Sequence, residues 1–330
     1  MYSPFCRDKS RRAVGARVNT DLLIMRLRNN GRNVNRDAAR RPLNVRRILY
    51  VAAVFNCLPI AVLLCLWRLP LPVPLFIAGI VIFLFFFLAA RWDLTGYHLR
   101  YILLLALFLI VYHRGEWWAL AVLGGAVGLT ALVLRRPPRI PTIGLQFPLQ
   151  GAMYCIVQGG NARWLNRHRI SKSQRFALDI VALNWYGSRA RGICPALLRD
   201  YRIFGEMVYS PCSGTVTAAV NGLPDEPPGR MDRSNPAGNY VIIRSDAHDI
   251  YVGLAHLMNG SVVVRPSDRV EAGQSLARTG NSGNTSEPHL HIHAKRGGRP
   301  TSMLDGEGVP MLFTQRWLIR NALIWKSKRT

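Results

Sequence analysis

Three histidines alternate with two aliphatic residues near the end of the chain, in the segment His289-Leu290-His291-Ile292-His293. Because successive side chains of a β-strand point to opposite faces, a strand here places all three imidazoles on one face and the two aliphatic side chains in a core. Neutral imidazole is a common zinc ligand, so one histidine of this face could bind a metal while its neighbour acts on substrate. The same pattern also fits a polar strand face at the surface, and its interpretation depends on context.

Several short segments upstream supply that context. They are Asp179-Ile180, 205–216, Gly253-Leu254-Ala255-His256-Leu257, Val270-Glu271-Ala272-Gly273-Gln274 and Asn281-Ser282-Gly283-Asn284. Together with the histidine strand, this set resembles the lysostaphin-type zinc endopeptidases, the LytM-like enzymes that cut peptidoglycan peptides. The resemblance spans roughly residues 147–295. It implies a mainly antiparallel β-sheet peptidase domain of the lysostaphin type, a bound Zn²⁺ and a peptidoglycan peptide as substrate.

The resemblance also implies a metal ligand four residues before Asp179, but this chain has Arg175 at that position. A guanidinium group has no lone pair to give to a metal. His168 is the nearest imidazole upstream, and we predict that His168, Asp179 and His291 bind the zinc and leave a fourth position for water or substrate. Two alternatives stay open. His293 could replace His168 as a ligand, or Arg175 could pair with Asp179 in a site that has lost its metal.

His256 and His289 match the two histidines that do not bind metal in the family, and the resemblance implies a catalytic role for both. They would orient or deprotonate a water molecule of lowered pKa and donate a hydrogen bond to the developing oxyanion. The alternative for His256 is an ordinary histidine at the edge of a core.

The elements that must position these residues are short runs rich in Val, Ile and Tyr between Gly, Pro and Asn. Such runs predict strands at 153–157, 176–183, 214–219, 240–244, 250–256 and 290–293, in a mostly antiparallel sheet. Gly283 should supply a positive φ in the turn before the histidine strand. Residues 314–326 are a candidate terminal helix. Cys194 and Cys212 could pair if the domain is exported.

The N-terminal half of the chain has a different composition. Hydrophobic residues crowd between 48 and 134 and follow an arginine-rich segment. We predict a basic flexible leader at 1–47, a transmembrane α-helical region of three or four segments at 48–134, a linker at 135–147 and the zinc peptidase domain at 148–330. The runs 48–67, 71–90 and 117–134 are near the length that crosses a membrane, whereas 101–112 is shorter.

The number of crossings decides on which side the peptidase domain lies. With the basic leader in the cytoplasm, three crossings export the domain and four retain it. Arg135, Arg136 and Arg139 follow the last run and favour the cytoplasm, so the charges leave the choice open. Because an enzyme that cuts the wall needs export, we expect a bacterial inner (cytoplasmic) membrane location with the catalytic domain on the periplasmic or extracytoplasmic side.

The formal net charge of +25 suits nucleic acid, anionic lipid or an anionic wall polymer. The sequence lacks zinc-finger cysteine spacing, an RNP-like aromatic strand and a basic region leading into heptads, so nucleic acid is not an expected partner. The expected partners are peptidoglycan peptide and membrane lipid. We therefore predict a membrane-anchored zinc metalloendopeptidase acting on peptidoglycan. The alternatives are a catalytically inactive family member that binds wall peptide or activates another hydrolase, and an interaction module with no role in the wall.

Overall fold

The structure is a computed structural model that describes residues 52, 54–68, 73–113, 124, 125, 128, 136–246 and 249–327. Every described residue belongs to one compact unit, 45–330. The predicted basic leader at 1–47 and nearly all of the apolar run at 117–134 lie outside the described residues.

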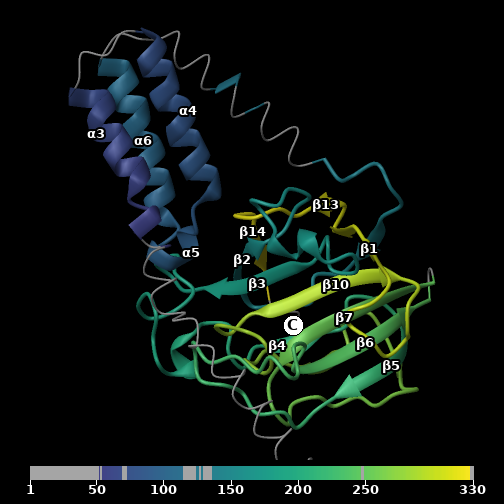
Figure 1. Ribbon diagram of the computed structural model, residues 1–330. Coiled ribbons are helices and arrows are strands. Elements are labelled where there is room, and N and C mark those ends of the chain that lie inside the picture. The colour runs from purple at the N-terminus through teal and green to yellow at the C-terminus, as the bar shows by residue number, and fades with distance from the viewer. Residues whose placement is uncertain are drawn as a thin grey trace, which may run out of the picture. The chain divides into compact units, whose positions relative to one another are not determined.

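The described part of the apolar region is helical. It forms α3 (Leu58–Arg68), α4 (Val73–Ala89), the short α5 (Trp92–Thr95) and α6 (His98–His113) (Figure 1). Helix α3 packs against α4 and α6, and Leu66, Phe83 and Leu107 are at most 1% exposed in the core between them. Within the described residues, no helix combines the length and apolar character needed to cross a membrane.

The C-terminal region forms β-sheets that begin after residue 142 (Figure 1). Within the described residues, nine strands form one sheet in the order β14-β2-β3-β10-β7-β6-β5-β8, with β11 paired to β10. Their bounds are β2 (Ala152–Gln158), β3 (Leu178–Leu183), β5 (Gly214–Val220), β6 (Asn239–Ser245), β7 (Ile250–Leu257), β8 (Arg269–Val270), β10 (Leu290–Arg296), β11 (Glu307–Val309) and β14 (Leu323–Lys326). Every pairing in this sheet is antiparallel, which confirms the predicted mainly antiparallel fold.

Smaller elements surround the large sheet. Strand β1 (Ile143–Leu145) pairs in parallel with β12 (Met311–Phe313), which pairs with β13 (Arg316–Trp317). Strand β4 (Met207–Tyr209) pairs with β9 (Ser275–Arg278). The two 3₁₀ helices are η1 (Arg167–Ile170) and η2 (Leu198–Asp200). Cys194 and Cys212 do not form a disulfide with each other.

The predicted terminal helix at 314–326 is wrong, because this segment forms β13 and β14. Thr314 and Gln315 both have positive φ, at 51° and 61°, and turn the chain between Phe313 and Arg316 as a two-residue hairpin. Strand β14 then pairs with β2, about 170 residues earlier in the chain. Sheet pairing over this distance outweighs the local preference for helix.

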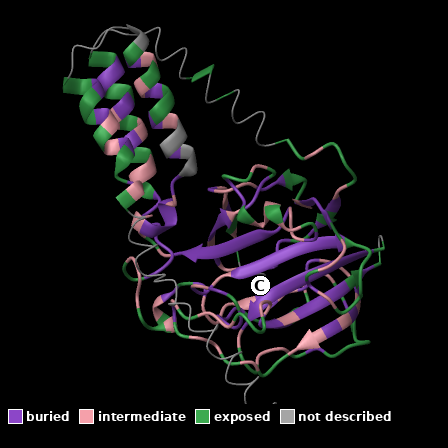
Figure 2. Cartoon of the chain, in the orientation of Figure 1, coloured by how far each residue is buried: buried purple, intermediate pink, exposed green. Residues whose placement is uncertain are grey.

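The central strands carry the core of the peptidase region. Strands β3 and β7 are buried along their whole length (Figure 2). On β10, Leu290 and Ile292 are 0% exposed and belong to the main hydrophobic cluster, as the alternation of this strand predicts. Its histidines therefore point to the opposite face.

Candidate metal centre

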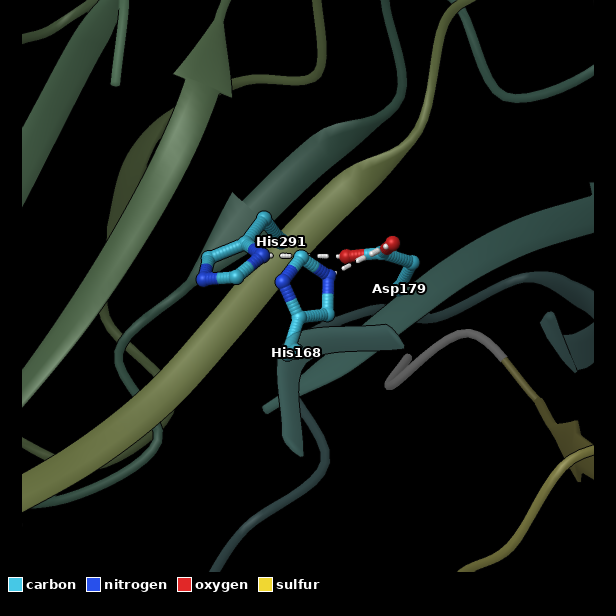
Figure 3. Close-up of side chains that lie close together, drawn as sticks. All are labelled: His168, Asp179 and His291. Atoms are coloured by element: carbon cyan, nitrogen blue, oxygen red, sulfur yellow. Dashed lines mark hydrogen bonds and ion pairs between the residues drawn. The ribbon is translucent and has the colours of Figure 1, made fainter. Parts of the chain in front are cut away.

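Three of the predicted site residues converge from separate elements. Asp179 on β3 lies directly opposite His291 on β10 in the antiparallel register, and His168 comes from η1. Nδ1 of His291 lies 3.0 Å from Oδ1 of Asp179, and Nε2 of His168 lies 2.9 Å from Oδ2 (Figure 3). One ligand atom from each residue lies within 4.8 Å of the other two. Two imidazole nitrogens and a carboxylate oxygen at this spacing match an open zinc site with one position free.

Asn166 fixes the position of His168. Its side-chain oxygen accepts a hydrogen bond from the backbone N–H of His168 at 3.1 Å, which caps η1. Its amide nitrogen donates to the carbonyls of Gly160 and Ala177, both at 3.1 Å. Asn166 is 0% exposed, so these bonds have no competition from water. They tie η1 to the residues just before β3, and therefore to Asp179.

The electrostatics of Asp179 and His291 suit a cation. Burial by itself raises the pKa of Asp179, but His168, His289 and His291 outweigh this effect and hold it well below its usual range. Burial lowers the pKa of His291, which keeps this imidazole neutral. Metal ligands must be an ionised carboxylate and neutral imidazoles, and these two residues are already in that state. The residues present therefore fit a bound zinc ion.

The surroundings of His293 and Arg175 bear on the two alternatives for the ligand set. His293 lies behind His291, with its Nδ1 3.1 Å from Nε2 of His291, and His168 is the histidine beside Asp179. Asp179 forms ion pairs with histidines only, and among the described residues Arg175 makes none with it. Instead, the guanidinium carbon of Arg175 lies 5.6 Å from the centre of the Phe176 ring.

The two predicted catalytic histidines lie beside this group. The ring centres of His256 and His289 are 4.8 Å apart, and Nε2 of His289 is 3.6 Å from Oδ1 of Asp179. Nδ1 of His256 lies 2.9 Å from the carbonyl oxygen of Ser282, so Nδ1 carries the proton and Nε2 keeps its lone pair. Burial, then His289 and His291, hold the pKa of His256 well below its usual range, which keeps the ring neutral.

The backbone around these histidines is shaped to present them. His256 has a φ of 61°, a conformation that L-residues rarely adopt and that is concentrated at functional sites. Gly283 has the predicted positive φ, 89°, and a side chain there would meet the backbone of Gly238. Nδ1 of His289 donates to the carbonyl of Glu287 at 2.9 Å, with the hydroxyl oxygen of Thr285 at 3.1 Å.

The structure also contains a buried charge network that the sequence did not suggest. The side chain of Glu287 accepts hydrogen bonds from Nε of Arg189 at 2.9 Å and from Nη2 of Arg91 at 3.0 Å. Nε of Arg91 also donates to Asp93 at 3.0 Å. Asp93 lies in α5, and Glu287 precedes His289 by two residues. We define Arg91, Asp93, Arg189 and Glu287 as the Glu287 network. Its members lie up to 196 residues apart, and no local pattern could have indicated it.

Residues 200–303 match the family model of Peptidase family M23. Over 107 residues the chain is 32% identical to the peptidoglycan DD-endopeptidase ShyA of Vibrio cholerae, a match that covers 31% of this chain and 24% of that protein. The chain therefore spans about a quarter of the length of this curated relative.

Two solved structures of low overall similarity are the catalytic domain of lysostaphin from Staphylococcus simulans and the M23 metalloprotease pseudoalterin from the deep sea. The first is 21% identical with a TM-score of 0.24, and the match covers 32% of this chain and 68% of that one. The second is 17% identical with a TM-score of 0.30, and the match covers 48% of this chain and 74% of that one.

The family match contains His256, His289 and His291 and begins after His168 and Asp179. The resemblance to the lysostaphin-type peptidases is confirmed, through a match to peptidase family M23 that spans residues 200–303.

Proposed function

We propose that this chain is a zinc metalloendopeptidase that hydrolyses peptide bonds in peptidoglycan peptides. The observation that carries the proposal is the convergence of His168, Asp179 and His291, from η1, β3 and β10, beside a second pair of histidines. The relative that the chain resembles over 107 residues is a peptidoglycan endopeptidase, which supports the same substrate class.

The side chains of the site divide the work of hydrolysis. When bound, zinc supplies Lewis-acid polarisation of the scissile carbonyl and a lowered pKa for the attacking water. The neutral ring of His256 presents the lone pair of Nε2, which can accept a hydrogen bond from that water and orient it. His289 can accept the proton at Nε2, because its Nδ1 donates to the carbonyl of Glu287 and leaves the lone pair on Nε2. Protonated His289 can then donate to the oxyanion or to the leaving amine.

Metal content and wall digestion test the proposal together. The full chain should carry about one zinc ion and release peptides from purified sacculi, and a chelator should stop the release. His168→Ala and His291→Ala should each lose the zinc, whereas Arg175→Ala should keep it, since a guanidinium cannot bind zinc. Full zinc occupancy in His168→Ala would show that this ligand is wrong. A chain that binds sacculi, holds no zinc and releases nothing would be an inactive family member.

We further propose that the chain lies at the bacterial cytoplasmic membrane, with the peptidase domain on the periplasmic or extracytoplasmic side. In support, the described helices expose large apolar side chains, with Leu64, Val81 and Phe108 at 55%, 58% and 46% exposure. Exposed apolar faces of this kind need a covering surface, and lipid is the covering expected here. Membrane fractionation and protease accessibility in spheroplasts test this. Recovery in the soluble fraction, or protection of the domain in intact spheroplasts, would contradict it.

A further inference from the structure

A basic pocket is lined by residues that are close in the chain to two candidate metal ligands. Its cavity has a volume of about 490 Å³, and it is lined by Asn161, Arg163, Arg169, Ile170, Lys172 and Arg175. The 3₁₀ helix η1, which carries His168, contributes Arg169 and Ile170. Arg175 lies four residues before Asp179. The pocket is therefore built from the same two segments that supply two of the three candidate metal ligands.

Its four cationic side chains have no ion-pair partner in the part of the chain that the structure describes. Among the described residues, none of Arg163, Arg169, Lys172 and Arg175 forms an ion pair, although many other arginines of this chain do. In the same part of the chain, Nε of Arg175 is buried and has no hydrogen-bond partner. A buried donor without an acceptor costs about 1–3 kcal/mol. Arg175 also lines the cavity, where an anion would compensate the charge of its guanidinium group.

The arginines are held close to one another. The guanidinium carbons of Arg169 and Arg175 lie 5.9 Å and 5.6 Å from the centre of the same ring, that of Phe176. Nε of Arg169 also donates to the carbonyl of Asn161 at 3.0 Å, which fixes its direction. Like charges gathered in this way repel one another, and a bound anion converts the repulsion into attraction.

We propose that this pocket binds a carboxylate of an acidic peptide substrate and so anchors that peptide beside the metal centre. This inference rests on the proposed function and adds the chemical class of the substrate to it. Guanidinium groups suit a carboxylate because their paired N–H donors match its two oxygens. Arg169 and Ile170 of the pocket directly follow His168 in η1, so a peptide that extends from the metal centre along η1 would bring a carboxylate to the pocket.

Co-sedimentation of the full chain with purified sacculi on ice tests the proposal, because it measures binding whether or not hydrolysis occurs. One set of sacculi is native, and in the other the carboxylates are converted to amides. The variant is Arg163→Gln/Lys172→Gln, which changes two exposed side chains and leaves the metal residues intact. The matched control is Arg265→Gln/Arg316→Gln, which removes the same charge from two exposed positions outside the pocket.

On native sacculi, the pocket variant should bind about tenfold more weakly than the parent, equivalent to about 1.4 kcal/mol, and the control should bind like the parent. On amidated sacculi, the pocket variant and the parent should bind equally. An equal loss in pocket variant and control, or the same pocket-variant loss on amidated sacculi, would overturn the proposal. Competition by inorganic phosphate but not by a glutamate-rich peptide would also overturn it, in favour of a phosphate site.

The zinc content separates this result from the proposed function. The pocket variant should retain the zinc of the parent, so a binding defect without zinc loss concerns the pocket alone. If the parent chain holds no zinc but still binds native sacculi more tightly than amidated sacculi, the peptidase proposal is contradicted and the proposed anion pocket is supported.

Discussion

Replacing Glu287 with glutamine should destabilise the folded chain at neutral pH, since it removes one charge from the Glu287 network. Glu287 is 4% exposed and Arg189 is 1% exposed. Burial by itself raises the pKa of Glu287, but Arg189 and Arg91 outweigh it and lower the pKa to about 2 from an ordinary 4.5. Each tenfold change in proton affinity is about 1.4 kcal/mol, so the ionised carboxylate stabilises the fold by about 3 kcal/mol. Breaking a buried pair typically costs about 3–5 kcal/mol, in agreement.

The pH dependence of this loss has a definite sign. The pKa of Glu287 is lower in the folded chain than in the unfolded chain, so its contribution is complete above about pH 5 and disappears as the pH falls towards about 2. Glutamine does not titrate. The difference in free energy of unfolding between parent and Glu287→Gln should therefore be greatest at neutral pH and shrink steadily below about pH 4.5. Urea unfolding of the full chain across this range measures it.

Asp249→Asn is the matched control, because it makes the same carboxylate-to-amide change in an exposed ion pair. Asp249 lies 3.2 Å from Nε of Arg244, and the two side chains are 69% and 58% exposed. The control should lose less than about 0.5 kcal/mol. A Glu287→Gln variant as stable as the control, or a difference that does not change with pH, would refute the reasoning.

Three further substitutions test the surroundings of the site. His293→Ala should weaken zinc binding about tenfold to a hundredfold without abolishing it, because Nδ1 of His293 lies 3.1 Å from Nε2 of His291 and orients that ring. Competition with a zinc-binding dye measures the zinc affinity, and an unchanged affinity would contradict the prediction. Thr285→Val should slow wall digestion about fivefold with the zinc retained, because it removes a hydroxyl bound to the Glu287 carbonyl at 2.8 Å and close to His289. Asn239→Ala should cost about 2–3 kcal/mol in urea unfolding, because this amide is 0% exposed and donates to Leu223 and Leu257; a loss below about 0.5 kcal/mol would show that the bonds do not matter.

The parts of the site with a fixed local period could be predicted from the sequence. The alternation of residues 289–293 has the period of a strand, and this period alone separates the imidazoles from Leu290 and Ile292. The assignment of His168 used the chemistry of Arg175, which cannot be a metal ligand. The structure brings His168 to Asp179 as that reasoning required, 2.9 Å apart. The other ligand candidate, His293, differs from His168 in its neighbour, because it contacts His291 and not Asp179. The sequence does not show which neighbour a histidine contacts.

The parts that could not be predicted depend on contacts between distant segments. Residues 314–326 contain a helix-like pattern, and only the pairing of β14 with β2 shows that they are extended. Arg91 lies at the end of an apolar run, where a positive charge ordinarily indicates a membrane boundary. Its actual partner, Glu287, is 196 residues away. The sign of the charge on Arg91 predicts neither its ion-pair partner nor how far its side chain is buried.

The Glu287 network has a consequence for where the functional unit begins. The family match starts at residue 200, and the predicted peptidase domain starts at 148, yet Arg91 and Asp93 lie well before both. A fragment of residues 148–330 keeps every candidate metal ligand and both candidate catalytic histidines. It loses one of the two arginines that bind Glu287 and the carboxylate of Asp93, which lies 3.6 Å from Nε of Arg189. Nη1 of Arg189 is already buried without a hydrogen-bond partner, so the fragment would contain a buried cation with one carboxylate in place of two. Because the carbonyl of Glu287 accepts a hydrogen bond from Nδ1 of His289, the segment from Arg91 to Asp93 at the start of α5 is part of the structure that positions this candidate catalytic histidine.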